Sequence, residues 1–249
     1  MHALELGEAI EDPLAPYAAV DRSKPDGGCW VTAHMVAGLD GTAAVQGRVG
    51  ALSTAPDKAL FADMRTLADV VLVGARTVRQ EGYGAIRLSD ERRASRAAEG
   101  LPETPPLAIV SRSLDLDWGS RAFTGAPADR RTIVVTCAAA PDAELARARE
   151  VADVLVAGEE SVDPDDLFAQ LAARGLQRVL CEGGPSWLGE LVVAGHVDEL
   201  CLTISPMMGG DPLPVAVFPP GAPLTGFSLQ QVLRDGDSLF LRYERSRDD

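Results

Sequence analysis

The sequence predicts an α/β fold, with a mixed, mainly parallel sheet flanked by helices and an antiparallel hairpin at the C-terminal end. Short apolar runs rich in β-branched residues recur along the chain, and amphipathic helical patterns separate several of them. Buried strands that alternate with helices are typical of parallel sheets covered on both faces. Near the C-terminus, Asp235-Gly236 lies between two β-like runs, and Asp-Gly at such a position indicates a hairpin turn.

The expected elements follow the apolar pattern. Strands are expected at Cys29–Val36, Val70–Val73, Leu107–Val110, Thr132–Thr136, Val154–Ala157, Val179–Cys181 and Leu200–Ile204. Helices are expected at Asp57–Leu67, Ala143–Val151, Pro164–Ala173 and Ser186–Val193. The hairpin is expected to pair Phe227–Leu233 with Ser238–Tyr243. Residues 88–104 are charged and then proline-rich, which predicts a solvated loop or a short helix.

Composition predicts one globular domain, residues 28–249, preceded by a surface arm, residues 1–27, that is rich in proline and acidic residues. The net charge of −14 would repel a phosphate backbone, so nucleic acid is not an expected partner. No apolar run approaches the length of a membrane span, and the acidic N-terminus lacks the layout of a signal peptide. These features predict a cytoplasmic protein with no membrane partner.

The four cysteines and three histidines show no metal-ligand spacing. No C-x-x-C occurs, and no histidine follows a cysteine at ligand distance along the chain. We therefore expect no metal site, and buried free thiols of the kind usual in a reducing compartment.

Glu182-Gly183-Gly184 follows an expected strand and precedes an expected helix that begins near Ser186. Paired glycines let a ligand approach the backbone closely, and a helix N-terminus offers free N–H groups to a pyrophosphate. A plain strand-to-helix turn would show the same glycine pair, and G-x-G-x-x-G is absent. Because Glu182 and both flanking elements accompany the pair, we favour ligand binding.

Gly74 and Thr77 form a second junction of this kind, after the expected strand Val70–Val73. The hydroxyl and N–H of Thr77 could bind a phosphate, and Arg76 could add charge. The alternative is a helix capped by Thr77, with Arg76 in solvent.

Polar residues follow two other expected strands. Ser111 and Arg112 could hold the ribose 2′-phosphate of NADPH, although an ordinary polar loop would look the same. Asp40, in the stretch GLDGT, could act as an acid, although Asp-Gly more often forms a turn.

Four stretches together resemble the reductase domain of bacterial riboflavin biosynthesis, the partner of a pyrimidine deaminase. They are GLDGTAA, ADVVLVGARTV, VSRSLDL and LCEGGPSWLGELVVAGHVDELCLTISPMMGGD, which occur in the family's order within residues 29–211. The EGG segment, with VDEL and the S-P-x-x-G-G ending, is the most specific. The resemblance implies a dihydrofolate-reductase-like fold, NADPH as cofactor, hydride transfer to a pyrimidine-linked ribose, and a homodimer.

The resemblance also implies roles for residues that match the family's motifs. The expected cofactor ligands are Thr54, Gly74, Arg76, Thr77, Ser111, Arg112, Glu182, Gly183, Gly184 and Ser186. The expected catalytic residues are Asp57, Asp40 and Glu182. The expected substrate ligands are His34, Asp57, Phe61 and Arg87.

The chain departs from the family's pattern mainly on the substrate side of the expected cleft. His34 stands where the family usually has a lysine, and G-L-D-G replaces S-L-D-G. Residues 79–84, RQEGYG, replace an acidic A-D-D-P stretch, and the tryptophan of W-I-T is missing from residues 51–54. The pattern therefore supports the cofactor half of the site better than any one substrate.

Asp57 and Phe61 point to a second kind of substrate. Classical dihydrofolate reductases carry an acid at the start of the helix that precedes the strand corresponding to Val70–Val73. A phenylalanine follows this acid four residues later. Asp57 and Phe61 have this spacing, and an i, i+4 pair shares one helix face. Such residues more often serve as a helix cap and a core side chain, and Asp57 could be both a cap and a cleft residue.

Three functions follow from these observations. The first is NADPH-dependent reduction of a pyrimidine precursor of riboflavin, as by 5-amino-6-(5-phosphoribosylamino)uracil reductase. The second is reduction of dihydrofolate or a pteridine, which Asp57 and the substrate-side departures favour. The third is a catalytically silent NADP(H)-binding protein, which NADPH oxidation with either substrate would exclude.

Overall fold

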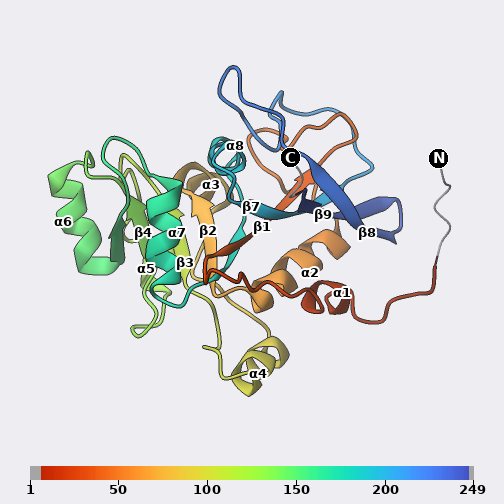
Figure 1. The fold of residues 1–249 in the computed structure, drawn as a ribbon, viewed down its shortest axis with the longest axis horizontal. Coiled ribbons are helices and arrows are strands. Elements are labelled where there is room, and N and C mark those ends of the chain that lie inside the picture. Colours follow the sequence, from red (N-terminus) through yellow and green to blue (C-terminus); the bar gives the residue numbers. More distant parts are fainter. Residues whose placement is uncertain (1–6, 247–249) are drawn as a thin grey trace.

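A nine-stranded mixed sheet runs through the computed structural model, which describes residues 7–246 (Figure 1). The strands lie in the order β5-β4-β3-β2-β6-β1-β7-β9-β8, and those from β5 to β7 run parallel. β9 pairs antiparallel with β7, and β8 pairs antiparallel with β9. The expected α/β fold, with a mainly parallel sheet and a C-terminal hairpin, is therefore confirmed.

The strands follow the expected apolar runs closely. They are β1 Trp30–Ala37, β2 Val70–Gly74, β3 Leu107–Val110, β4 Ile133–Thr136, β5 Asp153–Val156, β6 Arg178–Cys181, β7 Val197–Ile204, β8 Phe227–Asp235 and β9 Ser238–Arg245. β7 begins earlier than expected because Val197 already pairs with Val31 of β1. The hairpin turn is shorter than expected and consists of Gly236 and Asp237, with Gly236 at a φ of 56°.

Helices cover both faces of the sheet. They are α1 Ala15–Ala18, α2 Ala55–Met64, α3 Ala75–Glu81, α4 Asp90–Ala98, α5 Arg121–Thr124, α6 Asp142–Val151, α7 Pro164–Ala172 and α8 Pro185–Val193. One hydrophobic core joins α2 and α3 to the sheet through Met64 and Val78, and a second joins α7 and α8 through Leu171 and Leu188. The cores lie on opposite faces, because successive residues of β2 belong to different cores. None of the helices within residues 7–246 is long and apolar enough to cross a membrane.

The short helices α1 and α5 were not expected, and two further helical segments differ in detail from the expectation. The helix expected over Asp57–Leu67 ends as α2 and continues as η1, Arg65–Leu67, which is a turn of 3-10 helix. The charged part of residues 88–104 takes the helical alternative and forms α4. Its Arg96 is buried and donates hydrogen bonds to the carbonyls of Thr66 and Ala68, so α4 packs against η1.

The segment expected to be a surface arm is partly built into the domain. Leu14 and Tyr17 are buried, and Arg22 donates two hydrogen bonds to the buried carboxylate of Glu199, at 2.8 and 2.9 Å. The acidic, proline-rich composition predicted exposure throughout. Glu199 lies on β7, however, and a buried carboxylate without a cation would carry a large desolvation cost. Arg22 compensates that charge, so the segment from Leu14 to Arg22 packs with the core.

Candidate active site

A cleft of about 560 Å³ opens at the carboxyl ends of β1, β2 and β6. Parallel α/β sheets usually bind their ligands at this edge. Its lining includes His34, Ser53, Asp57, Lys58, Phe61, Arg65, Thr77, Glu81, Tyr83, Arg87, Arg121, Glu182, Gly183 and Gly184. The cleft thus brings together all four expected substrate ligands and four of the ten expected cofactor ligands, Thr77, Glu182, Gly183 and Gly184.

The turn after β6 and the start of α3 form one wall of the cleft. Gly74 N donates to the Gly183 carbonyl at 3.0 Å, and Gly184 N donates to the Thr77 hydroxyl at 3.2 Å. Gly183 and Gly184 have φ values of 94° and 29°, which side chains other than that of glycine rarely allow. A Cβ at Gly184 would lie 3.3 Å from Thr77 Oγ1. Two motifs that the sequence presents separately therefore form one backbone surface, which we call the glycine wall.

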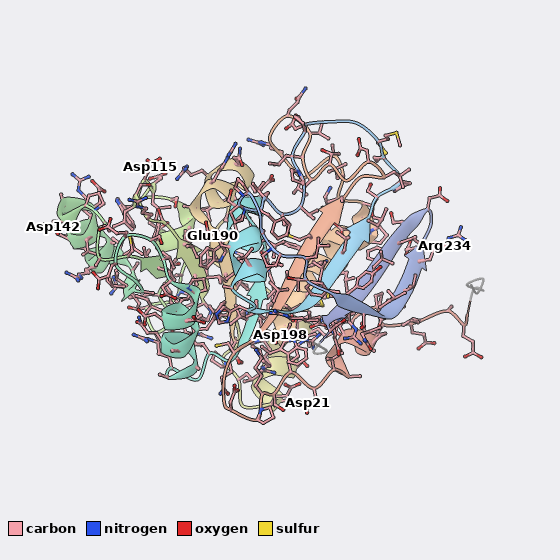
Figure 2. The ribbon with its side chains drawn as sticks, turned by 45° about the horizontal axis from the view of Figure 1, so that its top comes forward. Asp21, Asp115, Asp142, Glu190, Asp198 and Arg234 are labelled. Atoms are coloured by element: carbon pink, nitrogen blue, oxygen red, sulfur yellow. The ribbon has the colours of Figure 1, made fainter. Side chains whose placement is uncertain are left out.

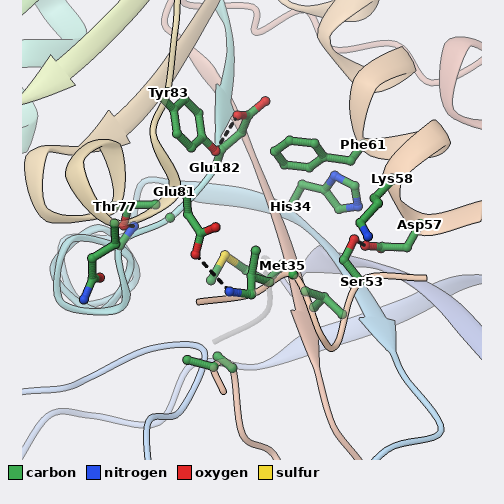
Figure 3. Close-up of a pocket in the computed structure, with 18 of the residues that line it drawn as sticks. His34, Met35, Ser53, Asp57, Lys58, Phe61, Thr77, Glu81, Tyr83 and Glu182 are labelled. Atoms are coloured by element: carbon green, nitrogen blue, oxygen red, sulfur yellow. Dashed lines mark hydrogen bonds between the residues drawn. The ribbon is translucent and has the colours of Figure 1, made fainter. Parts of the chain in front are cut away.

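Glu182 is buried beside the glycine wall and is fully engaged by other side chains. Arg65 donates two hydrogen bonds to its carboxylate, at 2.6 and 2.7 Å, and the Tyr83 hydroxyl donates a third, at 2.9 Å (Figure 3). Burial alone would lower the pKa of Arg65, but the ion pair with Glu182 raises it above its usual value. Burial and the Glu182 charge raise the pKa of Tyr83, so its phenol stays protonated and donates. Glu182 is thus an anionic anchor of the site.

α2 and η1 present three cleft residues at intervals of four along the chain, and we call them the α2 wall. Asp57 is buried and accepts a hydrogen bond from the Ser53 hydroxyl (Figure 3). Phe61 follows one turn later, and the Arg65 guanidinium lies over its ring at 4.7 Å. Arg65 was not among the expected site residues, although its spacing from Phe61 repeats the interval between Asp57 and Phe61.

Asp57 lies in the first turn of α2 and is not the cap residue. Thr54 holds the cap position, and its side chain makes no capping hydrogen bond. Thr54 Oγ1 is buried without a hydrogen-bond partner in the described part of the chain, and Thr54 does not line the cleft. Asp57, in contrast, lines the cleft, and Ser53 is the one hydrogen-bond partner that its carboxylate has within residues 7–246.

His34 lies on β1 beside the α2 wall. Its ring is buried and lies 5.4 Å from that of Phe61, and Figure 3 shows it between Phe61 and Lys58. Its Nδ1 has no hydrogen-bond partner among residues 7–246. Burial lowers the pKa of His34, and the charges of Asp57 and Glu182 offset this only in part. The cleft thus contains a neutral imidazole with an unused polar atom.

Several expected site residues do not line the cleft. Asp40 is exposed, and its carboxylate accepts hydrogen bonds from Gly209 N at 2.7 Å and Thr42 N at 3.2 Å. The Gly209 bond, followed by that from Thr42, lowers the pKa of Asp40. Asp40 therefore stabilises a loop outside the cleft that contains Asp57 and Glu182. The turn alternative for Asp-Gly predicted this role. Arg76 and Ser186 are exposed on the first turns of α3 and α8.

Ser111 and Arg112 lie at the carboxyl end of β3, next to β2 in the sheet. The Ser111 hydroxyl is buried and accepts a hydrogen bond from Leu114 N at 3.1 Å, which closes the loop. Arg112 is exposed. Gly74 pairs with Val110, the residue before this pair, but neither Ser111 nor Arg112 belongs to the cleft lining.

Two acids that the sequence analysis missed hold the loop after β1 over the cleft. Asp211 accepts hydrogen bonds from Gln46 N at 3.1 Å and Gly47 N at 2.6 Å. Glu81, from the end of α3, accepts one from Val49 N at 2.9 Å (Figure 3). A carboxylate that binds backbone N–H groups of a remote loop leaves no pattern in the sequence, so neither residue could have been expected.

Known proteins match this chain over most of its length. The model of the RibD C-terminal domain family matches residues 29–241. A reductase from Archaeoglobus fulgidus, named 2,5-diamino-6-ribosylamino-4(3H)-pyrimidinone 5′-phosphate reductase, is 27% identical over 182 residues, 73% of this chain and 82% of that protein. A protein of the same name from Aquifex aeolicus is 31% identical over 157 residues, 62% of this chain and 65% of that protein.

Solved structures agree with this result. A pyrimidine reductase-like protein from Corynebacterium diphtheriae superposes with a TM-score of 0.81 at 27% identity, with 96% of each chain covered. Because the family model matches well over half of the sequence, the assignment does not depend on any single relative. This chain belongs to the RibD C-terminal domain family.

Proposed function

We propose that this protein is an NADPH-dependent reductase of a phosphorylated ribosylaminopyrimidine, of the kind that precedes riboflavin. Membership of the family and the names of the A. fulgidus and A. aeolicus relatives support a pyrimidine phosphate reductase. The observation that carries the proposal is that the glycine wall and the α2 wall line one cleft. A backbone surface for a dinucleotide thereby meets a carboxylate and an aromatic ring that suit a pyrimidine.

The glycine wall fits the cofactor. Gly183 and Gly184 line the cleft and carry no side chain, so a pyrophosphate could approach their backbone closely. We assign the pyrophosphate to this wall and the 2′-phosphate to Ser111 and Arg112, because a guanidinium pairs well with a phosphate. When bound, the cofactor supplies the hydride, and the chain orients the reactants and excludes water.

The α2 wall fits the substrate ring. Asp57 can accept hydrogen bonds from ring N–H groups and can pass a proton to a ring nitrogen. Phe61 and the neutral ring of His34 offer a flat apolar surface, and the open Nδ1 of His34 adds one polar contact. Glu182 acts indirectly in this arrangement, since its carboxylate holds Arg65 and Tyr83 in place.

Dihydrofolate or a pteridine is a second candidate substrate. Asp57 favours it, because a buried carboxylate beside an aromatic ring suits the amino and N–H groups of a pterin as well as those of a pyrimidine. A catalytically silent NADP(H)-binding protein is a third possibility, and it would bind the cofactor through the glycine wall without turnover.

One assay separates the three candidates. NADPH consumption is followed at 340 nm with the full chain, side by side with the ribosylaminopyrimidine 5′-phosphate and with dihydrofolate. We expect a much higher kcat/KM with the pyrimidine phosphate. A preference for dihydrofolate would move the function to the second candidate. NADPH binding without oxidation by either substrate would support the third.

We also propose that the protein is a cytoplasmic homodimer. β8 is the outermost strand, beside β9 (Figure 1). Its Leu229 side chain is exposed, and no strand within residues 7–246 pairs with its outer edge. An uncovered edge strand readily pairs with another chain, so a second copy is a suitable cover. The four buried free thiols fit a reducing compartment. A monomer by light scattering at micromolar concentration would contradict the dimer.

A further inference from the structure

Arg96, on α4, is a buried cation without a carboxylate partner. Many charged side chains of the chain lie exposed on the surface, as Asp115, Asp142 and Arg234 do (Figure 2). Arg96 is only 1% exposed, and it forms no ion pair with any residue between 7 and 246. Burial, followed by repulsion from Arg178, lowers the pKa of its guanidinium. A buried cation without an anion has a large desolvation cost, which its hydrogen bonds must offset.

The hydrogen bonds of Arg96 all go to backbone carbonyls. Nε donates to the Pro102 carbonyl at 2.7 Å, in the segment that follows α4. Nη1 donates to the Thr66 carbonyl at 2.7 Å and to the Ala68 carbonyl at 2.6 Å. The last carbonyls of a helix have no partner within the helix, and a cationic side chain is a favourable cap for them. Arg96 therefore caps η1 from a different helix.

Arg92 makes a second contact between α4 and the same stretch of chain. It donates two hydrogen bonds to the Asp63 carboxylate, at 3.2 and 2.9 Å. Arg92 and Arg96 are four residues apart, so they share one face of α4. This face thus contacts the chain on both sides of Arg65, at Asp63 before it and in η1 after it.

Arg65 has to meet two partners at once. Its Nε and Nη2 donate to the two carboxylate oxygens of Glu182, and its guanidinium lies over the Phe61 ring. A paired hydrogen bond of this kind tolerates little displacement, because both bonds must keep their length and direction. Arg65 is also the residue at which α2 passes into η1. The path of η1 therefore decides where the Arg65 side chain begins.

We propose that Arg96 is a positioning residue for the substrate side of the cleft, because it holds η1 where Arg65 reaches both Glu182 and Phe61. No residue of α4 lines the cleft, so Arg96 acts through Arg65 and touches no ligand itself. Its effect on turnover rests on the proposed reductase function, whereas its effect on the placement of Arg65 does not. The alternative is that Arg96 only attaches α4 to the domain, and Arg65 would then keep its partners without it.

The direct test follows the Nε–H signal of Arg65 by NMR in the isotope-labelled full chain. Arg65→Lys lacks this signal and so identifies it. In the wild type, the Nε–H should exchange slowly with water, because it donates to a buried carboxylate. Arg96→Gln should speed this exchange about tenfold or more, and Arg96→Lys should do so less, since it keeps the charge.

Arg93→Gln is the matched control for the NMR test. Arg93 lies on the same helix and pairs with Asp90 and Glu103 at the surface. Its replacement should leave the exchange of the Arg65 Nε–H unchanged, because it removes an arginine of α4 that does not contact η1.

A kinetic double-mutant cycle tests the consequence for the reaction. With NADPH and the ribosylaminopyrimidine 5′-phosphate, Arg96→Gln should lower kcat/KM about tenfold and leave the NADPH affinity unchanged. In the Arg65→Lys background, the same change should cost about twofold at most, because the residue through which Arg96 acts is already altered. A residue that only attaches α4 would cost the same in both backgrounds.

Unchanged exchange of the Arg65 Nε–H in a folded Arg96→Gln variant would overturn the proposal, and so would equal losses in the two backgrounds of the cycle. If Arg96→Gln does not fold, Arg96→Lys decides by the same two measurements. If neither variant folds, Arg96 serves folding alone, which also overturns the proposal. If the wild type reduces none of the substrates, the reductase function fails, and the exchange measurement still decides whether Arg96 positions Arg65.

Discussion

The glycine wall and the α2 wall hold their ligand-facing groups by different means. The glycine wall depends on backbone hydrogen bonds, such as Gly74 N to the Gly183 carbonyl. The α2 wall depends on side chains from remote segments, since Arg65 meets Glu182 across 117 residues of sequence. Replacing one residue of a side-chain wall changes the functional group that it offers to a ligand. The N–H and carbonyl groups of a backbone wall stay the same when a side chain is replaced, provided that the backbone keeps its conformation.

The largest expected effect breaks the glycine wall. Gly184→Val places a branched side chain at a φ of 29° and against Thr77 Oγ1, where a Cβ alone would already lie 3.3 Å away. NADPH binding should fall below detection in a fluorescence titration, while circular dichroism still reports a folded domain. Gly184→Ala should show a smaller loss in the same direction. An unchanged titration would mean that the turn is structural only.

The next effect breaks the α2 wall and spares the glycine wall. Asp57→Asn keeps the shape and can still accept a hydrogen bond from Ser53, but it removes the charge and the proton. We expect kcat/KM for the true substrate to fall by about 100-fold, with NADPH affinity preserved. Asn has nearly the same volume and keeps an acceptor for the Ser53 hydroxyl, so the melting temperature should barely move. Wild-type turnover would leave Asp57 a structural residue.

A smaller effect concerns the outer border of the glycine wall. Arg112 is exposed beside the buried Ser111, and its guanidinium is the proposed partner of the 2′-phosphate. Arg112→Ala should weaken NADPH binding about tenfold and leave NADH binding unchanged, because NADH lacks that phosphate. Arg147→Ala serves as the control for the loss of an exposed arginine. Equal losses for the two cofactors would contradict the assignment.

The smallest expected effect is a pH dependence of the stability, caused by His34 on the substrate side of the cleft. Burial lowers the pKa of His34 in the folded state. In the unfolded chain, His34 takes up a proton below its ordinary pKa near 6.5, so the unfolded state binds more protons there than the folded state does. Wild-type stability should therefore decline as the pH falls below about 6.5, by at most about 1.4 kcal/mol for each pH unit. His34→Gln should lose less between pH 7.5 and 5.5 in thermal melts. Identical acid dependence in both proteins would show that His34 does not contribute.

Four residues of the site could not be expected from the sequence: Arg65, Tyr83, Glu81 and Asp211. Each acts through a partner far along the chain or through the backbone of a remote loop. The N-terminal segment shows the same limit, since Arg22 meets Glu199 across 177 residues. The local composition of this segment predicted a surface position. Only the fold shows that the buried Glu199 carboxylate needs the charge of Arg22.

Local patterns in the sequence specify the order of the strands, the four helices α2, α6, α7 and α8, the hairpin, and the glycine turns after β2 and β6. Those features depend on hydrophobic periodicity and on backbone angles, which residues a few positions apart specify. Only the folded chain shows that Glu182 anchors Arg65 and Tyr83, that Asp40 lies apart from Asp57, and that Arg121 lines the cleft with Arg87. Such side-chain contacts join segments through the packing of the whole sheet, and no local pattern encodes which segments will meet.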